Sequence, residues 1–185
     1  MNYPKFADVC GTRYPLKTSF RVGLRCFRVI NDPNISDEER ALAVIYLLFG
    51  FVPSENLEVF LEKADLFLSC GKKNDGSGTG RTPDMDFEAD SAYISASFMS
   101  DYKIDLRNVD LHWWQFCELI GGLTETAVLS RVREIRNYDL TQIKDEKTKQ
   151  KIMAAKQAFA LPVRHSAEEQ QAIDEFEALF EQKGG

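Results

Sequence analysis

The stretch VDLHWWQFCELIGGL, from Val109 to Leu123, decides between two interpretations of the chain. It contains His112, Cys117 and Glu118, residue types that metal and catalytic sites use, beside two tryptophans. On a helix, residues five or six positions apart point to different faces, so these three side chains do not converge. The stretch is therefore not predicted to be a catalytic or metal site.

The apolar residues of the same stretch share one helical face. Trp113, Phe116 and Ile120 lie at positions i, i+3 and i+7, the spacing of a helix that packs against a core. His112 would stand in the first turn as a structural or capping residue, because no zinc ligand follows it at helical spacing. The predicted packing signature comprises His112, Trp113, Trp114, Phe116 and Ile120.

Other segments carry start and stop signals for helices. Ser19 precedes an amphipathic run that ends before Pro33, and Ser36 with Glu39 forms a capping box for a helix that ends at Gly50. The segment 55–70 has apolar residues at helical spacing throughout. Further helices are expected near 84–100, between a cap at Asn108 or Asp110 and Gly121, after Thr124, in a lysine-rich stretch, and after a second capping box at Ser166 and Glu169.

These signals predict an all-α (mainly α) fold. We expect a single-domain helical bundle of about seven to eight helices, with a small N-terminal β-hairpin around Gly11. Residues 1–161 form the predicted helical domain, and residues 162–185 form a C-terminal helical extension after Pro162. The glycine-rich segment 71–83 is interpreted as a flexible linker, since no strand precedes it and no Lys-Ser/Thr pair follows, as a phosphate-binding loop requires.

Composition narrows the function classes further. The net charge of −6 makes nucleic-acid binding unlikely as a bulk property, and the longest apolar run, Ala41 to Val52, is shorter than the roughly 20 residues of a membrane span. The cysteines are scattered without metal-binding spacing, which is typical of reduced thiols in a cytoplasmic protein. They are Cys10, Cys26, Cys70 and Cys117.

Two charged segments of the sequence are candidate sites. The carboxylates Asp84, Asp86, Glu88 and Asp90 alternate by two and would scatter around a helix, so an acidic first turn is favoured over a cation site. A second segment is basic, and a solvated helix face is its simplest interpretation. Its candidate partner-binding residues are Arg131, Arg133 and Arg136. No catalytic, cofactor-binding or metal-ligating residue is predicted.

The segment 86–123, DFEADSAYISASFMSDYKIDLRNVDLHWWQFCELIGGL, strongly resembles the bacteriophage gene product fifteen family of tailed phages and Gram-positive prophages. The family pattern has an acidic start, an I-x-x-x-F helix, Y-x-I-D-L and H-W-W-x-F-x-x-L. The matching residues here are Asp86, Asp90, Ile94, Phe98, Tyr102, Ile104, Asp105, Leu106, His112, Trp113, Trp114, Phe116 and Leu119. The likeness extends upstream to YPLKTSFRVGLRCFRVINDPNISDEERALAVIYLLFG, residues 14–50, and downstream to near Leu161.

The resemblance implies a non-enzymatic assembly factor. Members of the family are encoded between the major tail protein and the tape-measure protein, a position typical of tail assembly chaperones. The expected partners are the tape-measure protein and tail-tube protein, with a homo-oligomer as a further expectation, and the expected location is the host bacterial cytoplasm. The alternative is a permanent structural protein of the phage tail or head-tail connector. A metal- or nucleotide-dependent enzyme is disfavoured because no ligands converge.

Overall fold

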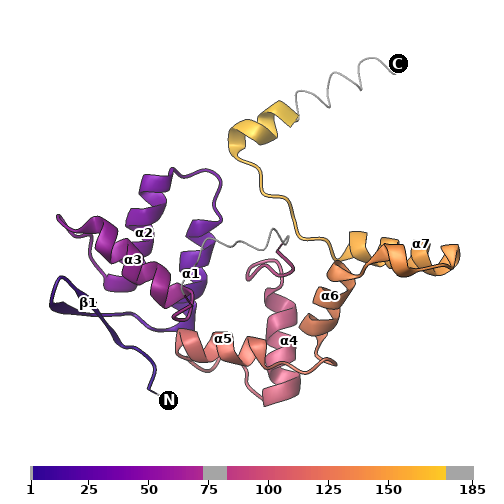
Figure 1. Cartoon of the computed structure of the whole chain (residues 1–185), viewed down its shortest axis with the longest axis horizontal. Coiled ribbons are helices and arrows are strands. Elements are labelled where there is room, and N and C mark those ends of the chain that lie inside the picture. The colour runs from indigo at the N-terminus through magenta and orange to yellow at the C-terminus, as the bar shows by residue number, and fades with distance from the viewer. Residues whose placement is uncertain (1, 73–82, 174–185) are drawn as a thin grey trace.

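The computed structural model of the protein describes residues 2–72 and 83–173, which are mainly helical (Figure 1). This confirms the predicted fold class. The described helices are α1 (Phe20–Ile30), α2 (Asp37–Phe49), α3 (Leu57–Leu68), α4 (Ser91–Tyr102), α5 (Trp113–Gly121), α6 (Val128–Asn137), the 3-10 turn η1 (Leu140–Gln142) and α7 (Glu146–Ala158). Residues 167–173 are also helical.

The N-terminal segment forms the predicted hairpin. Strand β1 (Phe6–Val9) pairs antiparallel with β2 (Thr12–Pro15), and Val9 lies opposite Thr12. The two residues between the strands, Cys10 and Gly11, have φ values of 48° and 81°. Positive φ at both central residues is the requirement of a type I′ turn, which matches the twist of two antiparallel strands. The hairpin packs against α3 through β1.

Helix starts were predicted correctly where a serine caps the first turn. The Ser19 hydroxyl accepts a hydrogen bond from the Arg21 amide at 3.2 Å. Ser36 and Glu39 form the reciprocal capping box, and α2 ends at Gly50 with a φ of 86°, a left-handed conformation that glycine adopts without strain. The second capping box is also present, because the Ser166 hydroxyl accepts from the amide of residue 169 and the Glu169 carboxylate accepts from the amide of residue 166.

Other helix starts were predicted at the wrong residue. Helix α4 begins at Ser91 rather than near Asp84, because the Asp86 carboxylate accepts hydrogen bonds from the amides of Glu88 and Ala89 and holds a turn there. Helix α6 begins after Ala127 rather than Thr124. The predicted linker 71–83 lies largely outside the described residues, which omit 73–82.

Helix α5 joins two groups of helices (Figure 1). One group contains α1, α2, α3 and the hairpin, and the other contains α4 and α6. Helix α5 packs on α1 and on α4 and so contributes to both. Its Trp113 and Phe116 side chains are 1% exposed, as is expected of residues in the centre of a core. No helix in the described ranges is long and apolar enough to cross a membrane.

Candidate functional site: the double-tryptophan helix and its ion pairs

His112 is the N-cap of α5, where Asn108 or Asp110 had been expected. Its Nδ1 accepts a hydrogen bond from the Trp114 amide at 3.1 Å. A nitrogen that accepts carries no proton, so the neutral ring is protonated at Nε2, which lies 2.9 Å from the Pro4 carbonyl oxygen and donates to it. Both ring nitrogens are therefore used in structural hydrogen bonds.

The two tryptophans of the signature complete the end of α3. The Trp113 indole donates to the Leu68 carbonyl at 3.0 Å, and the Trp114 indole donates to the Phe67 carbonyl at 2.8 Å. The last carbonyls of a helix have no partner within the helix. The Leu68 carbonyl is satisfied by the Trp113 indole, whereas the Phe67 carbonyl also accepts from the Cys70 amide at 3.1 Å. The double tryptophan fixes α5 against α3 by hydrogen bonds as well as by packing.

Gly23 on α1 provides the space for Trp113. A Cβ atom placed on Gly23 would lie 2.2 Å from the nearest atom of the indole ring, a distance that real side chains do not adopt. The same ring lies 5.5 Å from the Phe27 ring and 5.6 Å from the Phe87 ring, measured between centroids. Trp113 is thus enclosed by α1 and by the segment before α4.

Two cysteines that are far apart in the sequence meet beside this helix. Cys70 follows the end of α3, and Cys117 lies on α5. A hydrogen bond to Cys70, followed by burial, raises the pKa of the Cys117 thiol above its ordinary value. Both are free thiols. The sequence does not reveal the pair, because no local pattern connects the segment after α3 with α5.

A buried ion pair joins α4 to α6. The Arg136 guanidinium donates to both carboxylate oxygens of Asp90 at 2.7 Å, and the side chains are 10% and 1% exposed. Arg136 also donates to the carbonyls of Phe159 and Asp84, at 2.6 and 2.9 Å. The hydrogen bond with Asp90 raises the pKa of Arg136 above its ordinary value. Arg136 is accordingly committed to the interior of the fold.

The other two arginines of the predicted partner-binding set lie in different surroundings. Arg133 donates to Asp84 at 3.1 Å, with 38% of its side chain exposed. Burial alone would raise the pKa of Asp84, but hydrogen bonds from Arg133 and Asn137 outweigh it, so the pKa is lowered. Arg131 is exposed, and no described residue forms an ion pair with it. The set remains a prediction, with Arg131 its most accessible member.

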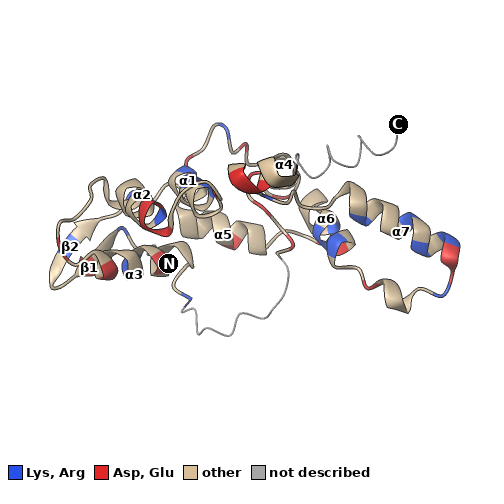
Figure 2. Cartoon of the chain, turned by 90° about the horizontal axis from the view of Figure 1, so that it is seen from above, with Lys and Arg blue, Asp and Glu red and all other residues tan. Residues whose placement is uncertain are grey.

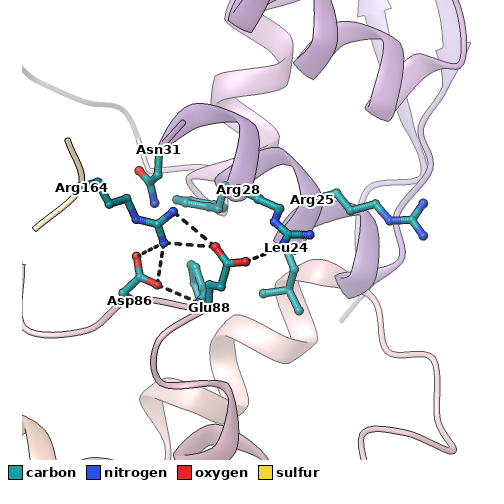
Figure 3. A pocket seen from close by; sticks show the side chains of 9 residues that line it. Leu24, Arg25, Arg28, Asn31, Asp86, Glu88 and Arg164 are labelled. Atoms are coloured by element: carbon teal, nitrogen blue, oxygen red, sulfur yellow. Dashed lines mark hydrogen bonds and ion pairs between the residues drawn. The ribbon is translucent and has the colours of Figure 1, made fainter. Parts of the chain in front are cut away.

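The acidic segment before α4 binds an arginine from the C-terminal segment (Figure 3). Arg164 lies 3.0 Å from Asp86 and 3.3 Å from Glu88, and Glu88 also pairs with Arg28 of α1 at 2.5 Å. We call these four residues the Arg164 cluster. Burial opposes ionisation of Asp86, but the amides of Ala89 and Glu88 and then Arg164 lower its pKa. The alternating carboxylates, predicted to complement a helix dipole, form ion pairs instead.

A small pocket of about 200 Å³ adjoins the Arg164 cluster. Leu24 and Phe27 of α1 form part of its wall, whereas Arg25 points away from the cluster (Figure 3). The guanidinium groups of Arg28 and Arg164 are both paired with carboxylates. Through these ion pairs the cluster holds the C-terminal segment against the segment before α4 and against α1. Among the described residues, no group of three His, Cys, Asp or Glu side chains is placed to hold a metal ion.

The double-tryptophan helix, its caps and its neighbours lie within the span matched by a known family. The family described as Bacteriophage Gp15 protein matches residues 3–161. The chain belongs to the bacteriophage Gp15 family. No curated protein and no solved structure matches it.

Some of the sites described above lie inside the span matched by the Gp15 family, and one extends beyond it. The packing signature, the Cys70 and Cys117 pair and the Asp90–Arg136 ion pair all lie inside the matched span. Arg164 lies outside it, so the Arg164 cluster joins the matched span to a segment beyond that span. The division of the chain into residues 1–161 and 162–185 remains a prediction.

Proposed function

We propose that this Gp15-family protein is a phage or prophage tail assembly factor. It acts as a non-enzymatic chaperone in the host cytoplasm, where it binds the tape-measure protein and tail-tube subunits. The family membership and the expected gene position support this assignment. Apolar helical stretches of a tape-measure protein need a binding surface until tube subunits surround them, and amphipathic helices bind in apolar grooves.

The observation that carries the proposal is an apolar groove beside the family signature. This groove has a volume of about 310 Å³, and Trp114 forms part of its wall. Two apolar side chains on its border are open to solvent, Phe6 at 46% and Leu66 at 37% exposure. We call it the Trp114 groove. Exposed apolar side chains that border one groove mark a surface for another protein.

A matched pair of leucines tests the proposal. Leu66 and Leu61 lie on the same helix with 37% and 39% exposure, but only Leu66 lines the Trp114 groove. In co-expression with the neighbouring tape-measure and tail-tube proteins, the wild type and Leu61→Gln should capture the tape-measure protein. Leu66→Gln should lose most of the captured protein, because a polar amide replaces the apolar contact.

Two outcomes would contradict this function. The first is that neither the tape-measure protein nor the tail-tube protein is retained by the wild type. The second is detection of the chain at stoichiometric levels in purified virions by mass spectrometry, which would identify a permanent structural protein of the tail or connector. A chaperone leaves the particle after assembly and should be missing from it.

A further inference from the structure

A second apolar groove, of about 520 Å³, lies between α2 and α3. It does not share a lining residue with the Trp114 groove. Leu61 stands at its border with 39% exposure, while Val44 and Leu68 are buried beneath. Ile30 and Ala41 complete its apolar lining. We call it the α2–α3 groove.

One wall of the α2–α3 groove is acidic. Glu58, Glu62 and Asp65 line it from α3, at positions i, i+4 and i+7, so they share one face of the helix. All three are exposed, and no described residue forms an ion pair with them. The cation on the opposite wall, Arg40, is already paired with Asp37 and donates to the Asp32 carbonyl. The groove therefore combines an apolar floor with uncompensated negative charge.

Helix α7 has the complementary character. It carries four lysines, contains no buried residue, and packs mainly on α6 and η1. Figure 2 shows basic residues recurring along it. One exposed stripe at helical spacing consists of Lys147, Lys151, Ala154 and Ala158. Small alanines allow a close approach to an apolar floor, and the lysines on the same stripe reach toward carboxylates.

We infer that α7 of one copy docks in the α2–α3 groove of a second copy. Helix α7 and the α2–α3 pair lie at opposite ends of the long axis of the molecule (Figure 1), so a chain cannot fill its own groove. Lys147 and Lys151 face Glu58 and Glu62, and the alanines cover Leu61. A contact between two different surfaces is heterologous, so copies join head to tail into rings or open chains.

Charge reversal on either surface tests the inference. The wild-type chain should show masses above that of one chain in sedimentation and light scattering, increasing with concentration and decreasing with salt. Glu58→Lys with Glu62→Lys, or Lys147→Glu with Lys151→Glu, should each weaken association on the order of tenfold. An equimolar mixture of the two variants should associate again, because each reversed surface meets a complementary one.

The leucine pair supplies the control for the apolar contact. Leu61→Gln should weaken self-association by about tenfold, and Leu66→Gln should leave it unchanged. This is the reverse of their effects on tape-measure capture, so the failure of one proposal does not imply failure of the other. Far-ultraviolet circular dichroism should be the same for every variant, since all the substituted side chains are exposed.

Three results would overturn the inference. The wild type remains monomeric up to millimolar concentration, or self-association is unaffected by every one of these variants, or the mixed charge-reversal variants fail to recover it. A monomeric wild type whose Leu61→Gln variant loses the tape-measure protein would assign the α2–α3 groove to that partner instead.

Discussion

The junction of α1 with α5 and the junction of α4 with α6 are both buried, but different forces hold them. At the first, an indole ring fills the space above a glycine, and its N–H group pairs with a helix end. At the second, a buried guanidinium donates to both oxygens of a buried carboxylate. Apolar fit depends on volume, whereas a buried ion pair depends on both charges being present. The two junctions should therefore fail under different substitutions.

The largest effect is expected from removing one charge of the buried pair. Arg136→Met should lower the free energy of unfolding by about 3–5 kcal/mol, because Asp90 would remain buried without its partner. Urea denaturation measures this change. Adding Asp90→Leu to Arg136→Met should restore much of the loss, since two apolar residues of similar volume replace the pair.

The neighbouring Arg133→Met provides the control for that prediction. Its ion pair with Asp84 is partly exposed, with side-chain exposures of 38% and 30%. Partly exposed pairs contribute at most about 1 kcal/mol, so this variant should be only slightly destabilised. Equal losses for Arg133→Met and Arg136→Met would show that burial does not distinguish the two arginines.

A smaller loss is expected from filling the space above Gly23. Gly23→Ala should cost roughly 1–3 kcal/mol of unfolding free energy, because the new methyl group overlaps the Trp113 ring. Gly121→Ala is the matched control on α5, where no atom lies within 4 Å of an added Cβ. That control should be neutral or slightly stabilising. Thermal denaturation measures both variants. Equal melting temperatures for Gly23→Ala and Gly121→Ala would contradict the close contact between Gly23 and the Trp113 ring.

The smallest effect is expected from acid, and Asp84 and Asp86 beside α4 should contribute to it. Asp84 and Asp86 have lowered pKa values in the folded protein, so the unfolded state binds more protons as the pH falls. The stability they contribute is present above the ordinary aspartate pKa of about 3.9 and is lost as the pH falls through their lower folded values.

Calorimetry from neutral pH down to about pH 3 measures that loss. In Asp86→Asn the melting temperature should decrease less steeply as the pH falls, because one of the titrating groups is gone. An equally steep decrease in this variant would place the titration elsewhere.

Short sequence patterns correctly predicted those structural elements that depend on hydrogen bonds or backbone conformation within a few neighbouring residues. The serine caps, the Gly50 stop and the hairpin each depend on a few adjacent residues, and the sequence reveals them directly. The buried face of the double-tryptophan helix was also predictable, because helical spacing alone gathers Trp113, Phe116 and Ile120.

The start of α4 was misplaced by a local turn at Asp86, and the remaining errors involve partners far along the chain. Thr124 was expected to cap α6, but its hydroxyl and its amide both donate to Asp101, so the helix begins after Ala127. Asp90 lies 46 residues from Arg136, and no sequence pattern near either residue predicts the ion pair. The two grooves likewise require the packing of separate helices, and a single sequence contains no pattern for them.

The position of the tryptophans has a consequence for spectroscopy. The chain contains only two, and both indoles donate to the same end of α3. Intrinsic tryptophan emission therefore reports on one small region where α3 meets α5. Unfolding confined to α6 and α7 should leave that emission unchanged, so a fluorescence trace and an ellipticity trace that coincide would indicate cooperative unfolding across the whole domain.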